Sequence, residues 1–116
     1  SHFLNLFFNK FAIICLFNNS NLGMVRQMQQ LFYGKRYEIT DLTAADGHYY
    51  PDFLKWAESY DCKAMRVSSS EDIIPALEAA KNNTSGPTLI DFIISPDDLV
   101  LPMVKSGTPL SDMILR

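Results

Sequence analysis

The strongest constraint on this chain is a change of hydrophobic pattern within residues 11–37. Residues 11–17, FAIICLF, form an apolar run rich in strand-forming side chains. The run stops at the polar tetrapeptide NNSN, and residues 22–32 then carry apolar side chains at helical spacing. The pattern therefore predicts a buried strand, a polar turn and a helix.

The polar turn falls where the carboxyl end of a strand meets a helix N-terminus, the place where open α/β sheets bind anionic ligands. Asn19 can offer a side-chain oxygen there and Asn21 a backbone carbonyl. Mg²⁺ accepts both while keeping phosphate oxygens and water as other ligands. Asparagine also tolerates left-handed backbone and caps helices, so residue types alone favour a purely structural turn.

Longer stretches carry a resemblance to a known family. The run NNSNLGMVRQMQQLFYGKRY resembles the carboxyl-terminal cofactor domain of the acetolactate synthase (acetohydroxyacid synthase) catalytic subunit, a thiamine-diphosphate enzyme. Three later runs are similar to the same enzyme: PDFLKWAESYDCKAMRVSSSEDIIPALEAA, GPTLIDFIIS and VLPMVKSGTPLSDMIL. The resemblance covers residues 12–115 and implies a domain that binds thiamine diphosphate and Mg²⁺.

The resemblance also implies roles for individual residues. In the family, the Asp of a Gly-Asp-Gly triplet, the second Asn of a later Asn-Asn pair and a carbonyl two residues further on hold the Mg²⁺ that anchors the diphosphate. Asn19 and Asn21 match the last two of these positions. Leu22, Gly23 and Met24 match the part of the family helix that borders the cofactor.

Two further residues match the family's substrate channel. Met28 stands where family members carry a Trp that narrows the pocket for the second 2-ketoacid. Ser106 lies in the tail that, in the family, wraps back near the active-site entrance. The resemblance therefore implies that Met28 and Ser106 shape substrate access. For Val25 and Phe32, on the same helix as Met28, core packing is the favoured interpretation.

The amino-terminal end departs from the family pattern. The sequence contains no Gly-Asp-Gly, and at the family's spacing the triplet would lie before residue 1. Residues 1–10, SHFLNLFFNK, do not resemble the family and are predicted to be an atypical segment, either a helix packed on the sheet or non-native sequence. Residues 11–116 are predicted to be the carboxyl-terminal part of a thiamine-diphosphate-binding domain.

The rest of the chain continues the alternation of strands and helices. Pro51 fits the first turn of a second helix after a polar connector that contains His48, interpreted as a solvated loop residue. The resemblance implies left-handed backbone at Asp61, which stands at the helix C-cap where the family usually carries Gly. Further strands are predicted over 62–67 and 88–94.

A third helix is predicted between these two strands, running to about residue 82. Ser68 and Glu71 have capping-box spacing for its start. Its inward face is predicted to carry four apolar side chains: Ile73, Ile74, Leu77 and Ala80.

The order strand, helix, helix, strand, helix, strand predicts an α/β fold. We expect a three-layer parallel sheet, a partial thiamine-diphosphate-binding fold, with about three parallel strands joined by right-handed crossovers and flanked by helices. Such a sheet is about half of a doubly wound one, so residues 11–17 or a neighbouring strand should expose unpaired backbone and apolar surface.

Composition excludes several classes of function. A chain of 116 residues with a net charge of −3 and scattered Lys and Arg carries no basic footprint for nucleic acid. Residues 1–17 are apolar, but they lack a basic leader region and are interrupted by Asn5, Asn9 and Lys10, so neither a signal peptide nor a membrane span is predicted. A cytoplasmic location is expected.

The two cysteines lack the spacing of metal ligands. Cys15 falls inside the first predicted strand and Cys62 at the start of another. Both are predicted to be buried apolar side chains, which fits a reducing compartment.

The activity implied by the resemblance is decarboxylation of pyruvate and carboligation to a second 2-ketoacid, in branched-chain amino acid biosynthesis. Thiamine diphosphate and Mg²⁺ are the implied cofactors; FAD belongs to the full-length family enzyme and is not expected to bind this segment alone. The implied partners are the 2-ketoacid substrate, further copies of the chain in a homo-oligomer, and a regulatory subunit. Without Gly-Asp-Gly, the segment is predicted to be a fragment that is inactive by itself.

Two alternatives stay open. The chain can be a non-catalytic remnant or an interaction module, which a Gly-Asp-Gly-bearing segment in frame upstream would argue against. It can also come from another thiamine-diphosphate enzyme, such as glyoxylate carboligase or a pyruvate oxidase. The runs LGMVRQ-x-Q-x-LFY and LPMV-x-SG disfavour this second alternative.

Overall fold

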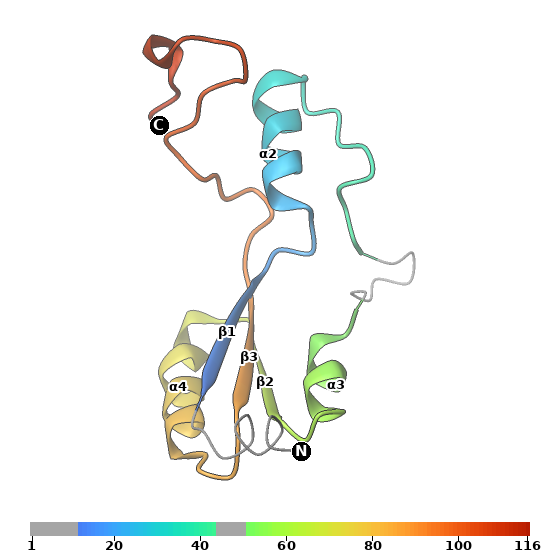
Figure 1. Ribbon diagram of the computed structural model, residues 1–116, viewed down its shortest axis with the longest axis vertical. Helices are drawn as coiled ribbons and strands as arrows, with labels where there is room; N and C mark the ends of the chain where they lie inside the picture. The colour runs from blue at the N-terminus through green and yellow to red at the C-terminus, as the bar shows by residue number, and fades with distance from the viewer. Residues whose placement is uncertain (1–11, 44–50) are drawn as a thin grey trace, which may run out of the picture.

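A computed structural model describes residues 12–43 and 51–116. Its centre is a sheet of three parallel strands in the order β1 (Ile13–Asn18), β3 (Thr88–Ile93), β2 (Lys63–Val67) (Figure 1). The predicted parallel sheet is confirmed, with strand ends shifted by one or two residues. The predictions for residues 1–10, Phe11 and His48 lie outside the described residues.

The central strand β3 is buried on both faces, as its continuous apolar sequence predicts. In the register of the sheet, Cys15 and Met65 flank Ile90, and Leu16 and Arg66 flank Asp91. Successive β3 side chains therefore serve opposite faces.

Helices α3 (Phe53–Glu58) and α4 (Ile73–Asn82) lie on opposite sides of the sheet (Figure 1). The connection from β1 to β2 crosses the sheet in one direction, and the connection from β2 back to β3 crosses it in the other. Crossovers of the same hand that run in opposite directions place their helices on opposite faces. This topology produces the three predicted layers.

The main apolar core lies between α4 and the sheet. Ala76 and Ala80 of α4 pack against Val67 and Ile90, with five half-buried residues around them: Ile13, Met65, Ile73, Leu77 and Phe92. The prediction that Ile74 faces inward is wrong, because this side chain is 63% exposed. The buried stripe of α4 instead runs through its alanines, whose small side chains allow close approach to the strands.

The opposite face of the sheet holds a buried charge. The Asp91 carboxylate is fully buried and accepts a hydrogen bond from Arg66 Nε at 3.2 Å. Arg66 Nη2 also lies 3.6 Å from Asp52 Oδ1, and Asp52 caps α3 by accepting from the backbone N–H groups of Leu54 and Lys55. This network ties the start of α3 to the sheet. The prediction that Pro51 lies in the first turn of this helix is wrong, because Asp52 is the N-cap and Pro51 precedes it.

The start of the α4 region differs from the predicted capping box. Ser69, and not Ser68, accepts from the backbone N–H of Glu71, and a 3₁₀ turn over Ser70–Asp72 precedes the α-helix. The prediction of left-handed backbone at Asp61 is confirmed by its φ of 57°.

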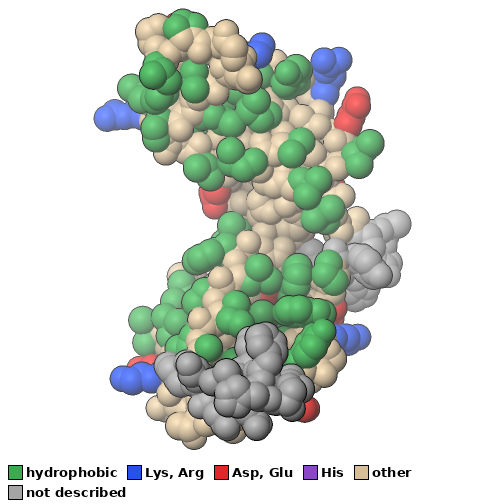
Figure 2. All heavy atoms as spheres, viewed as in Figure 1, with side chains coloured by type: hydrophobic (Ala, Val, Ile, Leu, Met, Phe, Trp, Pro, Cys, Tyr) green, Lys and Arg blue, Asp and Glu red, His purple; other side chains and the backbone are tan. Residues whose placement is uncertain are grey.

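Helix α2 (Gly23–Phe32) does not pack on the sheet. It lies beyond the carboxyl ends of the strands, beside the carboxyl-terminal segment (Figure 1). The predicted core packing is wrong for Val25, which is 50% exposed, while Phe32 is half-buried. The one buried side chain of α2 is the polar Gln27. The molecular surface narrows between the part around the sheet and the part around α2 (Figure 2).

Strand β1 forms one edge of the sheet and, among the described residues, pairs only with β3. Ile14 and Phe17 are exposed on it, so the predicted apolar edge is confirmed. The prediction that Cys15 is buried is wrong, because the core formed by α4 is centred on β2 and β3 and leaves this thiol exposed. In the part of the chain that the structure describes, no helix has the length and apolar character needed to cross a bilayer.

Candidate functional site

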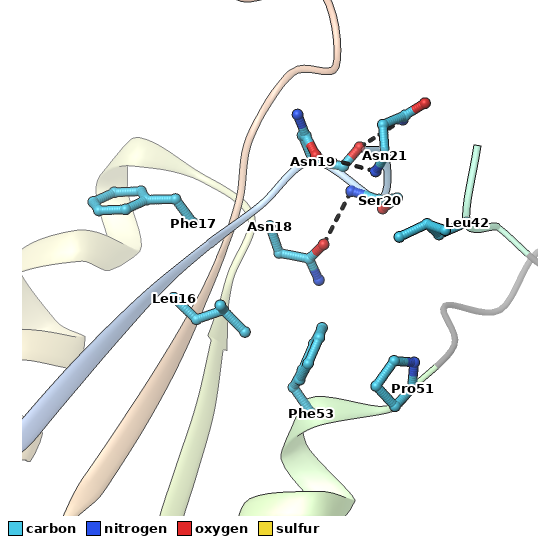
Figure 3. Close-up of a pocket in the computed structure, with 9 residues that line it drawn as sticks. All are labelled: Leu16, Phe17, Asn18, Asn19, Ser20, Asn21, Leu42, Pro51 and Phe53. Carbon is cyan, nitrogen blue, oxygen red and sulfur yellow. Dashed lines mark hydrogen bonds between the residues drawn. The ribbon is translucent and has the colours of Figure 1, made fainter. Parts of the chain in front are cut away.

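Two consecutive hydrogen bonds between side chain and backbone shape the turn after β1. Asn18 Oδ1 accepts from the backbone N–H of Ser20, and Asn19 Oδ1 accepts from that of Asn21, both at 3.0 Å (Figure 3). Asn21 Nδ2 donates back to the Asn19 carbonyl at 2.8 Å. These ties hold Ser20 in left-handed backbone, with φ of 59°.

The segment that follows α2 also holds this turn in place, through backbone hydrogen bonds. The Leu22 N–H donates to the Thr40 carbonyl and the Leu42 N–H to the Ser20 carbonyl, each at 2.8 Å. Asn21 and Asp41 thereby form an antiparallel bridge. The turn is therefore held between two segments and not left as a free loop.

Gly23 allows Asn19 to approach the start of α2. A Cβ atom at Gly23 would lie 2.8 Å from Asn19 Nδ2, closer than a real side-chain contact allows. Glycine at this position therefore lets the Asn19 amide sit directly against the helix N-terminus.

The N-terminus of α2 carries no compensating groups of its own. No side chain caps it, and its first turn has no acidic residue. Among the described residues, no acceptor pairs with the backbone N–H groups of Gly23, Met24 and Val25. Such groups, together with the helix dipole, favour an anion at this end of the helix.

Two pockets open on either side of the turn, and Asn19, Ser20 and Asn21 line both. The first, of about 190 Å³, has apolar walls that include Leu16 and Phe53. The second, of about 370 Å³, is more polar, with walls that include Arg26, Asp41 and Thr43.

Asn18 borders the first pocket with a free donor. The residue is 8% exposed, and its amide points toward the space between Leu16, Leu42 and Phe53 (Figure 3). Its Nδ2 is buried and meets no acceptor among the described residues.

The second pocket carries charges of both signs. Hydrogen bonds from Thr43, first from its side chain and then from its backbone N–H, lower the pKa of the Asp41 carboxyl, and Arg26 adds a small effect in the same direction. Asp41 is therefore ionised at neutral pH. Arg26, from the first turns of α2, supplies a positive charge on the same pocket.

The turn offers two neutral oxygens to a hard cation. The Asn21 carbonyl accepts none of the backbone hydrogen bonds described around it, and Asn19 Oδ1 keeps a second lone pair beside its bond to the Asn21 N–H. The described residues contain no group of three or more His, Cys, Asp or Glu side chains that would hold a metal ion. This donor set fits a cation such as Mg²⁺, which takes its remaining ligands from phosphate, water or another carboxylate.

The structure brings only some of the predicted site residues together. Asn19, Asn21 and Gly23 converge at the turn, and Leu22 joins them through its bond to Thr40. Met24 is 54% exposed on the first turn of α2.

Met28 and Ser106 lie elsewhere. Met28 is half-buried further along α2, and Ser106 is exposed in the carboxyl-terminal segment. Neither residue is among those that line the two pockets beside the turn.

Sequence reasoning missed Asn18, Thr40 and Asp41. The first Asn of the pair looked like an ordinary turn residue, and no spacing links residues 40 and 41 to the turn. The buried state of Thr40, 2% exposed, depends on a long-range bridge that only the folded chain shows.

Comparison with known proteins gives consistent matches. The model of the thiamine pyrophosphate enzyme C-terminal TPP-binding domain matches residues 2–92. The acetolactate synthase large subunit of Corynebacterium glutamicum is 46% identical over 100 residues, which is 86% of this chain and 16% of that protein. The probable acetolactate synthase large subunit of Methanococcus aeolicus is 45% identical over 103 residues, 89% of this chain and 16% of that protein.

A relative of lower identity also matches most of the chain. The acetolactate synthase large subunit of Cyanidium caldarium is 37% identical over 101 residues, 87% of this chain. The chain thus spans 16% of the length of each of these three relatives.

Proposed function

The chain belongs to the thiamine pyrophosphate enzyme family, as its C-terminal TPP-binding domain, and from that premise we propose that it is part of a thiamine-diphosphate- and Mg²⁺-dependent acetolactate synthase. The proposed reaction is decarboxylation of pyruvate and carboligation to a second 2-ketoacid, in branched-chain amino acid biosynthesis. The observation that carries the proposal is the 46% identity to an acetolactate synthase large subunit over 86% of the chain.

In this proposal the turn after β1 supplies part of the cofactor anchor. Asn19 Oδ1 and the Asn21 carbonyl would hold Mg²⁺, and the N–H groups of Gly23 and Met24 at the start of α2 would favour the negative charge of the diphosphate. The ties from Asn18 and the bridge to Asp41 keep these oxygens in place before the ligand arrives. Thiamine diphosphate, when bound, supplies the carbanion chemistry, and the protein supplies placement and electrostatics.

The proposal assigns substrate access to Met28 and Ser106, which lie on α2 and on the carboxyl-terminal segment. The partners in the complete enzyme are the 2-ketoacid substrate, further copies of the chain and a regulatory subunit, and FAD is a cofactor of the whole enzyme only. The proposed location is the cytoplasm.

A chimera tests this proposal. The matching stretch of the Corynebacterium glutamicum large subunit is replaced by this chain, and acetolactate formation from pyruvate is measured with Mg²⁺ and thiamine diphosphate. We expect activity. Asn19→Ala in the chimera should weaken cofactor binding by roughly a hundredfold, because a metal ligand is lost.

The matched control is Asn82→Ala, which changes an exposed asparagine at the end of α4 and should leave cofactor affinity unchanged. A chimera that folds, as judged by circular dichroism, but forms no acetolactate would refute the proposed function. Equal cofactor affinities in the two alanine variants would refute the role of Asn19.

A further inference from the structure

Helix α2 is held in place by polar side chains and not by apolar packing on the sheet. Its apolar residues Met24 and Val25 are half-exposed, and its only buried side chain is Gln27, at 3% exposure. The partner of Gln27 is the carboxyl-terminal segment, which runs beside α2 after leaving β3 (Figure 1). The attachment of this segment therefore depends on what Gln27 does.

The Gln27 amide pairs with both backbone groups of one residue. Its Nε2 donates to the Val100 carbonyl at 2.8 Å, and its Oε1 accepts from the Val100 N–H at 2.8 Å. Nε2 also lies 3.0 Å from Met103 Sδ. The amide thus satisfies the segment's backbone in the way that a neighbouring strand would.

Two other contacts join the same surfaces at the ends of α2. Near its start, Arg26 Nη2 donates to Asp97 Oδ1 at 2.8 Å. Near its end, Lys105 Nζ lies 5.8 Å from the ring centre of Phe32 and 5.7 Å from that of Tyr33. The segment therefore follows the helix from its first turn to its last, with Gln27 between the two outer contacts.

These three contacts differ in strength because they differ in burial. The Asp97 side chain is 68% exposed, and ion pairs in solvent contribute little. Cation–π contacts at exposed sites are also weak. The Gln27 amide is buried, although Val100 itself is 65% exposed, so its two bonds to the Val100 backbone are shielded on the side of the helix. Removal of this amide would leave the N–H and carbonyl of Val100 without their protein partners, which costs more than loss of an exposed contact.

We propose that Gln27 is a positioning residue that latches the carboxyl-terminal segment, residues 97–104, to α2. While the amide pair is intact, the helix and the segment keep one relative position. When it is broken, the segment separates from α2 although the sheet stays folded. Because Ser106 follows in the same stretch of chain, the latch also decides where Ser106 lies. This inference concerns the segment itself and stands independently of the proposed chemistry.

Amide hydrogen exchange in the 116-residue chain tests the latch. The variant Gln27→Met keeps the side-chain length and the helix propensity but removes both hydrogen bonds to Val100. We expect the Val100 N–H to exchange at least about tenfold faster, since two hydrogen bonds are lost. The N–H of Ile90, in the fully buried centre of β3, reports on the sheet and should keep its rate.

Gln29→Met is the matched control. Gln29 lies on the same helix, and its amide binds the other neighbouring segment, donating to the Glu38 carbonyl at 3.0 Å and accepting from Thr40 Oγ1 at 3.1 Å. Gln29→Met should leave the exchange rate of the Val100 N–H unchanged.

Three results would overturn the proposal. One is a Val100 N–H that is unprotected in the unsubstituted chain. Another is equal acceleration at Val100 and Ile90 in Gln27→Met, which would make Gln27 a residue of the whole fold. The third is a Val100 rate that responds equally to the two substitutions.

Discussion

At the scale of single residues, asparagine and glycine shape the candidate site through short contacts. The side-chain oxygens of Asn18 and Asn19 each accept a hydrogen bond from the backbone N–H two residues further along the chain. A Cβ atom at Gly23 would clash with the Asn19 amide. The result is a turn whose oxygens are oriented by the chain itself. Local surroundings likewise determine the reactivity of the two cysteine thiols and the proposed role of Met28 in substrate access.

The two thiols should differ in reactivity. Cys15 is exposed on the edge strand, whereas burial, with a smaller effect from Asp61, raises the pKa of the Cys62 thiol. A raised pKa means less thiolate at neutral pH, and the thiolate is the form that reacts. We expect iodoacetamide at pH 7.5 to label Cys15 first, at protein concentrations low enough to keep the chain monomeric, as followed by peptide mass spectrometry. Faster labelling of Cys62 would contradict the exposed position of β1.

Met28→Trp should change product choice in the active chimera. An indole presents a rigid wall to the second 2-ketoacid, whereas methionine is flexible and fills the same space without one. Discrimination by one methylene is worth roughly 1–3 kcal/mol at best. We therefore expect the substitution to raise the preference for 2-ketobutyrate over pyruvate by about tenfold, near 1.4 kcal/mol.

The measurement is the ratio of the two acetohydroxyacids when both ketoacids compete. Val25→Trp, at a half-exposed position of the same helix, is the control and should leave the ratio unchanged. An unchanged ratio in Met28→Trp would remove Met28 from the substrate channel.

At the scale of elements, helix ends are decided by which side chain reaches the free backbone groups. The serine run before α4 offers three candidates, and sequence spacing favours Ser68. The structure uses Ser69, because a 3₁₀ turn over Ser70–Asp72 precedes the α-helix and displaces the cap by one residue.

Alanine substitutions at the two serines should therefore have different effects. Ser69→Ala removes the side-chain acceptor of the Glu71 N–H and should lower the free energy of unfolding by about 1 kcal/mol. Ser68→Ala, its matched control at a neighbouring exposed serine, should change it by less than about 0.5 kcal/mol. Urea denaturation followed by circular dichroism gives both values. A larger loss at Ser68 would restore the capping box predicted from the sequence.

At the scale of the whole molecule, two parts of different character meet at a narrow region (Figure 2). The part around the sheet has an apolar core, whereas α2 is held to its two neighbouring segments by hydrogen bonds of Gln27 and Gln29 and by the ion pair of Arg26. Within residues 12–43 and 51–116, the sheet also ends at β1, with exposed Ile14 and Phe17. An unpaired apolar edge of this kind promotes association.

The chain should therefore self-associate through β1. Ile14→Lys places a charge on the edge strand and should shift the sedimentation profile toward monomer. Ile74→Lys, at an exposed isoleucine on α4, is the control and should not. A monomeric unsubstituted chain with a cooperative, high-temperature melt would contradict this prediction.

The 116-residue chain by itself should bind thiamine diphosphate weakly. Its turn supplies two neutral oxygens, and the described residues hold no cluster of three or more metal-binding side chains. Lack of a charged ligand should cost orders of magnitude in affinity. Isothermal titration of the chain with thiamine diphosphate in the presence of Mg²⁺ should show no micromolar binding. An activity assay with pyruvate should show no acetolactate formation. Micromolar Mg²⁺-dependent binding would contradict this expectation.

The sequence alone was sufficient for features that depend on local pattern. The apolar run before NNSN and the continuous burial of TLIDFI follow from side-chain periodicity, and they predicted the parallel sheet and the turn. The left-handed backbone at Asp61 was implied by the resemblance. The resemblance placed Asn19, Asn21 and Gly23 at one site, and the structure brings these three residues together.

Tertiary structure decided which surface each pattern meets. An apolar stripe shows that a helix has a buried face, but not what covers it, so Val25 was predicted to be in the core although α2 lies off the sheet. Cys15 is exposed because β1 is an edge, and Gln27 is buried because the segment around Val100 returns to α2 from 73 residues away along the chain. Such contacts depend on the closure of long loops, for which periodicity within a short window carries no signal.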